Sequence, residues 1–183
     1  MTQRAQGAGN GGALDRVVDP RGRAKAYRPL PQAAREAAIE RGLAAYERGA
    51  FYLAHEELEP AWMGTDDAAE RELLGGLIKV AAAFVHAARG NRSGAATNLR
   101  GARERLVGAA AADRDGGLDL PGLLAAIDDR LARLAAEPVA AESAELRGLP
   151  IPDQPHDVAG PPGRARRPPL DLQPPTLVRR SPA

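Results

Sequence analysis

The chain has 183 residues, a net charge of +1 and no cysteine, which excludes disulfides, thiolate metal sites and cysteine nucleophiles. Its length allows one domain, or one domain with long tails. No apolar run reaches the ~20 residues of a membrane-spanning helix, and the first residues lack the apolar core of a signal peptide. We therefore predict a cytoplasmic protein with no membrane-spanning segment.

Charge and proline content divide the chain into three parts. Residues 1–30 carry six basic and two acidic groups and are rich in glycine, which is typical of a disordered basic arm. Residues 138–183 contain eleven of the sixteen prolines and few apolar residues, so we expect a disordered tail. The domain is therefore expected over 31–137, where thirteen basic and seventeen acidic groups argue against a nucleic-acid partner.

Five helices are predicted within this domain, because apolar residues recur at helical spacing between residues typical of helix ends. The expected boundaries are Pro31 and Gly49 for the first helix, Gly64 for the end of the second, Asp67 and Gly90 for the third, Asn91 or Ser93 for the start of the fourth, and Asp119 and Pro138 for the fifth. No segment alternates with a period of two for long enough to form a strand. The predicted fold class is an all-α bundle.

The third predicted helix is apolar on nearly all sides, which is typical of a buried helix. Lys79 and His86 interrupt it, and their spacing of seven residues places them on nearly the same face. Asn91, just beyond the helix, can reach the same end. Burying such groups costs free energy unless they pair, hydrogen-bond or hold a ligand.

The second predicted helix contains the sequence AHEELEPAW, in which His55, Glu59 and Trp62 lie toward one side and Glu56 lies further round. His55 and Glu59 are one turn apart and can share a ligand. Pro60 removes a backbone donor, so we expect the helix to end, kink or restart there. We predict a polar cluster between the second and third helices, with its two histidines near one another. Its members are His55, Glu59, Trp62, Lys79, His86 and Asn91.

The string AHEELEPAW, followed by GGLIKVAAAFVHAARGNRSGAATNL, resembles the family known as domain-of-unknown-function family 309. Its members are small all-helical bacterial and archaeal proteins with an H-E-x-x-E-x-x-W block, a G-L-I-Q-x-A-A-A block, and then a histidine and G-N-x-x-G-A. The resemblance covers about 45–107 and implies a fold and a site location without a reaction. Lys79 stands where glutamine is usual, and Met63 stands where arginine is common. The matching positions are His55, Glu56, Glu59, Trp62, Gly76, Leu77, Ile78, Ala81 to Ala83, His86, Gly90, Asn91, Gly94 and Ala95.

Three functions fit the predicted cluster. The first is a structural network or a pocket for a small ligand, in which Lys79 pairs with Glu59 or Glu56. The second is a metal-dependent hydrolase, with a divalent transition metal held by His55, Glu59 and His86. Glu56 would then be the general base, although the ammonium of Lys79 would repel a metal. The third is an interaction module that binds a protein partner or a small anion.

Overall fold

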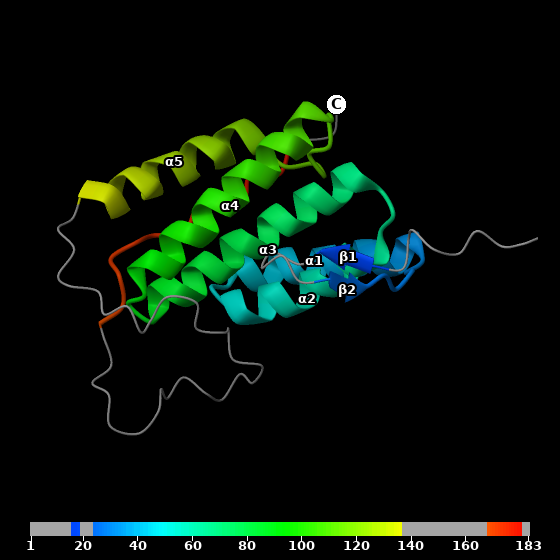
Figure 1. Ribbon diagram of the computed structural model, residues 1–183, viewed down its shortest axis with the longest axis horizontal. Helices are drawn as coiled ribbons and strands as arrows, with labels where there is room; N and C mark the ends of the chain where they lie inside the picture. Colours follow the sequence, from blue (N-terminus) through cyan, green and yellow to red (C-terminus); the bar gives the residue numbers. More distant parts are fainter. Residues whose placement is uncertain (1–15, 19–23, 137–167, 181–183) are drawn as a thin grey trace, which may run out of the picture.

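The computed structural model describes residues 16–18, 24–136 and 168–180. These residues form five helices and one pair of short strands (Figure 1). The elements are β1 (Arg16–Val18), β2 (Ala24–Ala26), α1 (Gln32–Glu47), α2 (Phe51–Gly64), α3 (Ala68–Ala88), α4 (Arg92–Ala111) and α5 (Leu120–Ala136). The predicted all-α bundle of about five helices is confirmed.

The ends of the helices follow from short-range chemistry. Gly49 separates α1 from α2 with a φ of 76°, a value that residues with a side chain rarely adopt. The Asp67 carboxylate accepts hydrogen bonds from two backbone N–H groups, at 2.8 and 3.1 Å, and so caps α3. The donation from the N–H of Glu70 is the main reason that the pKa of Asp67 is lowered. Asn91 caps α4 by accepting from the N–H of Gly94.

Helix α2 continues through Pro60 and ends at Gly64. Because proline has no N–H, the carbonyl of Glu56 loses its helical donor at this point. The helix nevertheless continues for one more turn, from residue 61 to Gly64. That turn carries Trp62, which is almost fully buried.

Helix α3 is the centre of the bundle. It packs against α2 and α4, while α1 packs on α2 and α5 packs on α4 (Figure 1). Fourteen of its twenty-one residues are buried, as its apolar sequence predicts. A Cβ at Gly76 would lie 2.7 Å from the Leu106 side chain, so this glycine permits the close approach of α4. Even α3 is not apolar over a length that would cross a bilayer, and the same holds for every other helix in the described part of the chain.

Part of the predicted N-terminal arm, 1–30, forms regular structure. Strands β1 and β2 pair in antiparallel register, with Arg16 opposite Ala26 and Val18 opposite Ala24. Three-residue strands are too short to produce a recognisable period of two, so the sequence pattern does not reveal them. Residues 1–15 and 19–23 lie outside the described part of the chain.

Part of the predicted C-terminal tail, 138–183, packs on the helices. We call residues 168–180 the strap (Figure 1, orange to red). Leu172, Pro175 and Leu177 of the strap are buried. The structure differs here from the expected disorder, because these side chains find an apolar surface made by segments distant in sequence. Residues 137–167 and 181–183 lie outside the described ranges.

Candidate functional site

Helices α2 and α3 run antiparallel, and two contacts fix their register. The ring centroids of Phe51 and Phe84 lie 5.4 Å apart. Near the other end of α2, the indole Nε1 of Trp62 would lie 3.3 Å from a Cβ at Gly75. A residue late in α2 therefore faces a residue early in α3.

This register sets which members of the predicted cluster can meet. It places Lys79 level with 56–58 of α2, next to its predicted glutamate partners, Glu56 and Glu59. It places His55 level with 80–82 of α3. His86 is about five residues further along, which is roughly 7 Å of helix axis. The two histidines are therefore offset from each other along the bundle.

Three polar residues of α3 face three glycines of α4, and both sets have a spacing of seven residues. A Cβ added to each glycine would meet the facing side chain, at 3.8 Å for Gly108 and Glu72 Cγ, 2.9 Å for Gly101 and Lys79 Nζ, and 2.6 Å for Gly94 and His86 Nδ1. We call these six residues the α3–α4 seam. The sequence pattern predicts α2 as the neighbour of Lys79 and His86, and the structure also places both against α4. The matching spacing of glycines in α4 is the sequence signal for this second neighbour.

His86 and Asn91 are buried together at the junction of α3 and α4. Asn91 Oδ1 accepts from the N–H of Gly94 at 2.8 Å, so the amide nitrogen faces His86 Nδ1 at 2.9 Å. Nδ1 is then an acceptor, and the ring proton of His86 is on Nε2. A histidine that binds a metal through Nε2 needs the opposite tautomer, with Nδ1–H donating to an acceptor. The site therefore does not suit His86 as a metal ligand through Nε2.

His55 is directed to a neighbour on its own helix. Its side chain is 17% exposed, and its Nδ1 lies 3.0 Å from Oε1 of Glu56, whose side chain is 46% exposed. Among the described residues, no three His, Asp or Glu side chains are grouped so that they could hold a metal ion. The structure thus does not bring together the predicted ligand set of His55, Glu59 and His86. Glu56, the predicted general base, faces His55.

Trp62 lies beside a cation that the sequence analysis did not single out. A Cβ at Gly75 would be 3.3 Å from Trp62 Nε1, 3.2 Å from Arg105 Cδ and 3.4 Å from Arg105 Nη1. Arg105 Nη1 also donates to Glu72 Oε1 at 2.8 Å. Trp62 Nε1 is buried, and it has no hydrogen-bond partner within the described part of the chain. Because Gly75 of α3 has no side chain, the indole N–H of Trp62 from α2 and the guanidinium of Arg105 from α4 can lie next to each other.

A further cation lies at the C-terminal end of α3. Arg89 is half-buried, and desolvation lowers its pKa, an effect that the neighbouring Tyr52 hydroxyl opposes. Half-buried positive charge therefore lies along α3 at three places: near its start (Arg105, beside Gly75), in its middle (Lys79) and at its end (Arg89).

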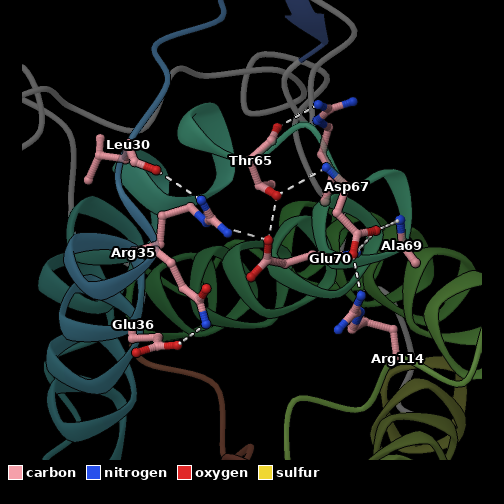
Figure 2. A network of polar contacts seen from close by, with 10 residues as sticks. Leu30, Arg35, Glu36, Thr65, Asp67, Ala69, Glu70 and Arg114 are labelled. Carbon is pink, nitrogen blue, oxygen red and sulfur yellow. Dashed lines mark hydrogen bonds and ion pairs between the residues drawn. The ribbon is translucent and has the colours of Figure 1, made fainter.

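The turn between α2 and α3 contains a second polar network, which the sequence analysis missed apart from the cap at Asp67 (Figure 2). Thr65 is fully buried, and its hydroxyl donates to the Glu70 carboxylate and accepts from the N–H of Asp67 at 3.2 Å. The Thr65 carbonyl accepts from Arg71 Nη2 at 2.6 Å. From α1, Arg35 Nε lies 3.6 Å from the same Glu70 carboxylate. The only sign of this network in the sequence is a threonine, Thr65, two residues before the helix cap Asp67.

The predicted pairing of Lys79 can be tested by a double-mutant cycle. Glu56 already faces His55, so we expect the partner to be Glu59. Lys79→Met should lower the free energy of unfolding by about 2 kcal/mol, between the values for exposed pairs and fully buried pairs, because a half-buried carboxylate loses its counter-charge. The double variant with Glu59→Met should recover most of this loss in urea denaturation. Additive losses would show that Lys79 has a different partner.

Comparison with known proteins gives a family match that lies within this helical core. The family model described as Domain of unknown function (DUF309) matches residues 39–98, which span the second half of α1, all of α2 and α3, and the start of α4. No curated protein and no solved structure matches the sequence. Residues 39–98 of this small helical protein are therefore similar to the DUF309 family.

Proposed function

We propose that the chain is a ligand-binding protein. Its site would lie where α2, α3 and α4 meet at Gly75 and would hold a small oxygen-bearing anion such as a carboxylate or a phosphate. The observation that carries this proposal is the indole N–H of Trp62, which is 1% exposed and lacks an acceptor among the described residues. An unpaired buried donor costs about 1–3 kcal/mol. An oxygen atom of a ligand would remove this cost. The cytoplasmic location predicted from the sequence remains part of the proposal.

Two cations supply the charge that such a ligand needs. A guanidinium has five N–H donors, and the bond from Arg105 Nη1 to Glu72 uses one of them. Arg105 is 21% exposed, so its remaining donors act in a partly desolvated setting, where a charged hydrogen bond is stronger than in water. Lys79, whose predicted partner is Glu59, lies one helical turn beyond Gly75 and adds positive charge to this half-buried region. The proposed anion would thus lie near Gly75, in contact with donors from two helices.

Two observations favour binding over metal-dependent hydrolysis. The amide of Asn91 directs a donor to His86 Nδ1, which disfavours the tautomer that a metal ligand requires. Glu56, the candidate base, is partly exposed and faces His55. We therefore assign no catalytic role to these residues in this proposal.

A second candidate function is purely structural and is favoured by the matched spacing of the α3–α4 seam. Long polar side chains on α3 lie over glycines on α4, so sliding the helices by one turn would place them against bulkier residues. Such an arrangement specifies one register of antiparallel helices. In this case, the polar cluster would hold the helices in place and bind nothing.

Trp62 provides a direct test, because it is the only tryptophan and gives one indole N–H resonance in a nitrogen-15 NMR spectrum. We expect this resonance to shift saturably when inorganic phosphate or acetate is added, and the stronger response identifies the class of anion. Arg105→Gln should weaken the response at least about tenfold, since a charge-assisted hydrogen bond contributes 1.5–3 kcal/mol.

Arg103→Gln is the matched control. Arg103 is on the same helix, but it is 49% exposed and pairs with Asp128. Its replacement should leave the titration unchanged. An indole resonance that ignores both anions would contradict ligand binding and favour the structural candidate. Equal effects of the two arginine replacements would indicate that anions bind the surface of α4 without a defined site.

A further inference from the structure

The strap runs along the bundle and is tied to it at both ends by main-chain hydrogen bonds. Near its start, the N–H of Leu170 donates to the carbonyl of Ala87 at the end of α3, at 2.9 Å. Near its end, the carbonyl of Val178 accepts from the N–H of Asp119 in the α4–α5 loop, also at 2.9 Å. The strap therefore follows the bundle from one end to the other in an extended conformation.

The middle of the strap is recognised through its carbonyl groups. The Tyr46 hydroxyl on α1 donates to the carbonyl of Pro175 at 3.0 Å. Arg130 on α5 donates to the carbonyls of Gln173 (2.9 Å) and Pro174 (3.4 Å). Burial raises the pKa of Tyr46, which keeps its hydroxyl protonated as a donor. Pro174 and Pro175 have no N–H, so the middle of the strap has fewer backbone donors that need a hydrogen-bond acceptor.

Side chains of the strap alternate between the bundle and solvent. Leu172, Pro175 and Leu177 are buried against the helices, whereas Gln173 and Thr176 are exposed. An extended chain that inserts alternate apolar side chains and offers its carbonyls to a hydroxyl and a guanidinium is bound in the manner of proline-rich peptides.

The end of the strap carries two positive charges that meet acidic groups. Arg179 donates to both carboxylate oxygens of Glu40 on α1, at 2.7 and 2.8 Å. Arg180 donates to Asp115 in the α4–α5 loop at 2.9 Å. These pairs are exposed, so each contributes about 0–1 kcal/mol, but they fix the direction in which the segment lies.

We propose that α1, α5 and the α4–α5 loop form a binding surface for an extended proline-rich peptide of another protein, and that the strap occupies this surface within the chain. The recognised pattern is Leu-x-x-Pro-x-Leu-x-Arg-Arg, as read from 172–180. A tethered segment competes at an effective concentration on the order of millimolar, so the strap limits binding to partners that are abundant or that bind more tightly. This inference is independent of the anion site, which lies on α2, α3 and α4.

The test measures binding of a fluorescent synthetic peptide with the sequence of 168–180 to the full-length protein. One variant, Leu172→Ser with Leu177→Ser, weakens the strap in its buried part. A second variant, Arg179→Ala with Arg180→Ala, weakens it only through exposed side chains and therefore keeps the fold intact. In both variants the peptide should bind more tightly than it binds the unaltered chain, because the tethered competitor is weakened. We expect a gain of at least about tenfold for the leucine replacements and of about threefold to tenfold for the arginine replacements, which remove only exposed ion pairs.

In the variant with both leucines replaced, where the strap no longer competes, Tyr46→Phe should weaken peptide binding about fivefold, the effect of one lost hydrogen bond. Tyr27→Phe is the matched control and should leave the affinity unchanged, because Tyr27 precedes α1 and takes no part in the hydrogen bonds to the strap described above. Equal binding to the altered and unaltered chains, or no binding to an arginine-substituted variant with native helical circular dichroism, would overturn the proposal. A dimer of the unaltered chain that dissociates when the strap is weakened would also overturn it, by assigning the surface to a second copy.

Discussion

Gly94→Ala is expected to lower the free energy of unfolding by about 2–3 kcal/mol. The new Cβ would lie 2.6 Å from His86 Nδ1 and 2.7 Å from Asn91 Nδ2, and both of these side chains are buried. Moving a packed ring costs about 1–3 kcal/mol, and disturbing the Asn91 cap of α4 costs about 0.5–2 kcal/mol. The higher helix propensity of alanine returns at most about 1 kcal/mol. Urea denaturation followed by circular dichroism measures the difference.

Gly108→Ala is the control for this prediction, because it makes the same substitution two heptads further along the same helix. A Cβ at Gly108 would lie 3.8 Å from Glu72 Cγ, which is an ordinary contact. We expect this variant to be as stable as the unaltered chain or more stable by up to about 1 kcal/mol. If Gly94→Ala had as little effect on stability, His86 could not occupy the space next to Gly94. The contact between His86 and Gly94 in the α3–α4 seam would then be contradicted.

Thr65→Val is expected to destabilise the protein by about 2 kcal/mol, although valine has nearly the same shape as threonine. The substitution removes the hydroxyl that donates to the Glu70 carboxylate and accepts from the N–H of Asp67. Both partners are partly buried, and a donor or acceptor left unpaired there costs about 1–3 kcal/mol. Arg35, at 3.6 Å, lies too far away to replace the lost hydrogen bond to Glu70 without moving. Thermal and urea denaturation both measure the loss.

Thr65→Ser provides the comparison, since it keeps the hydroxyl and removes only a methyl group. We expect it to cost less than Thr65→Val, at about 1 kcal/mol for one buried methyl group. A larger loss for serine than for valine would mean that the turn between α2 and α3 depends on apolar packing at Thr65. The hydrogen bonds of Figure 2 would then contribute little to stability.

Local signals in the sequence determined the helices of this protein. Proline and glycine, together with the capping side chains of Asp67 and Asn91, act within a few residues of themselves, so their effect on helix ends can be predicted without a structure. The apolar character of α3 on nearly all sides likewise predicted its central position. The blocks from His55 to Trp62 and from Gly76 to Ala95 carry the resemblance to the family whose model matches residues 39–98, and this resemblance depends on spacing along the chain.

Only the tertiary structure decided which residues meet across helices. His86 packs over Gly94, and Arg105 reaches Trp62 past Gly75, because the antiparallel register of three helices brings these positions together. The sequence contains the spacings but not the register, which depends on packing along the whole length of each pair. The strap is the extreme case: Pro175 contacts Tyr46, which is 129 residues earlier in the chain, and a proline-rich segment has no local pattern that reveals a distant apolar surface.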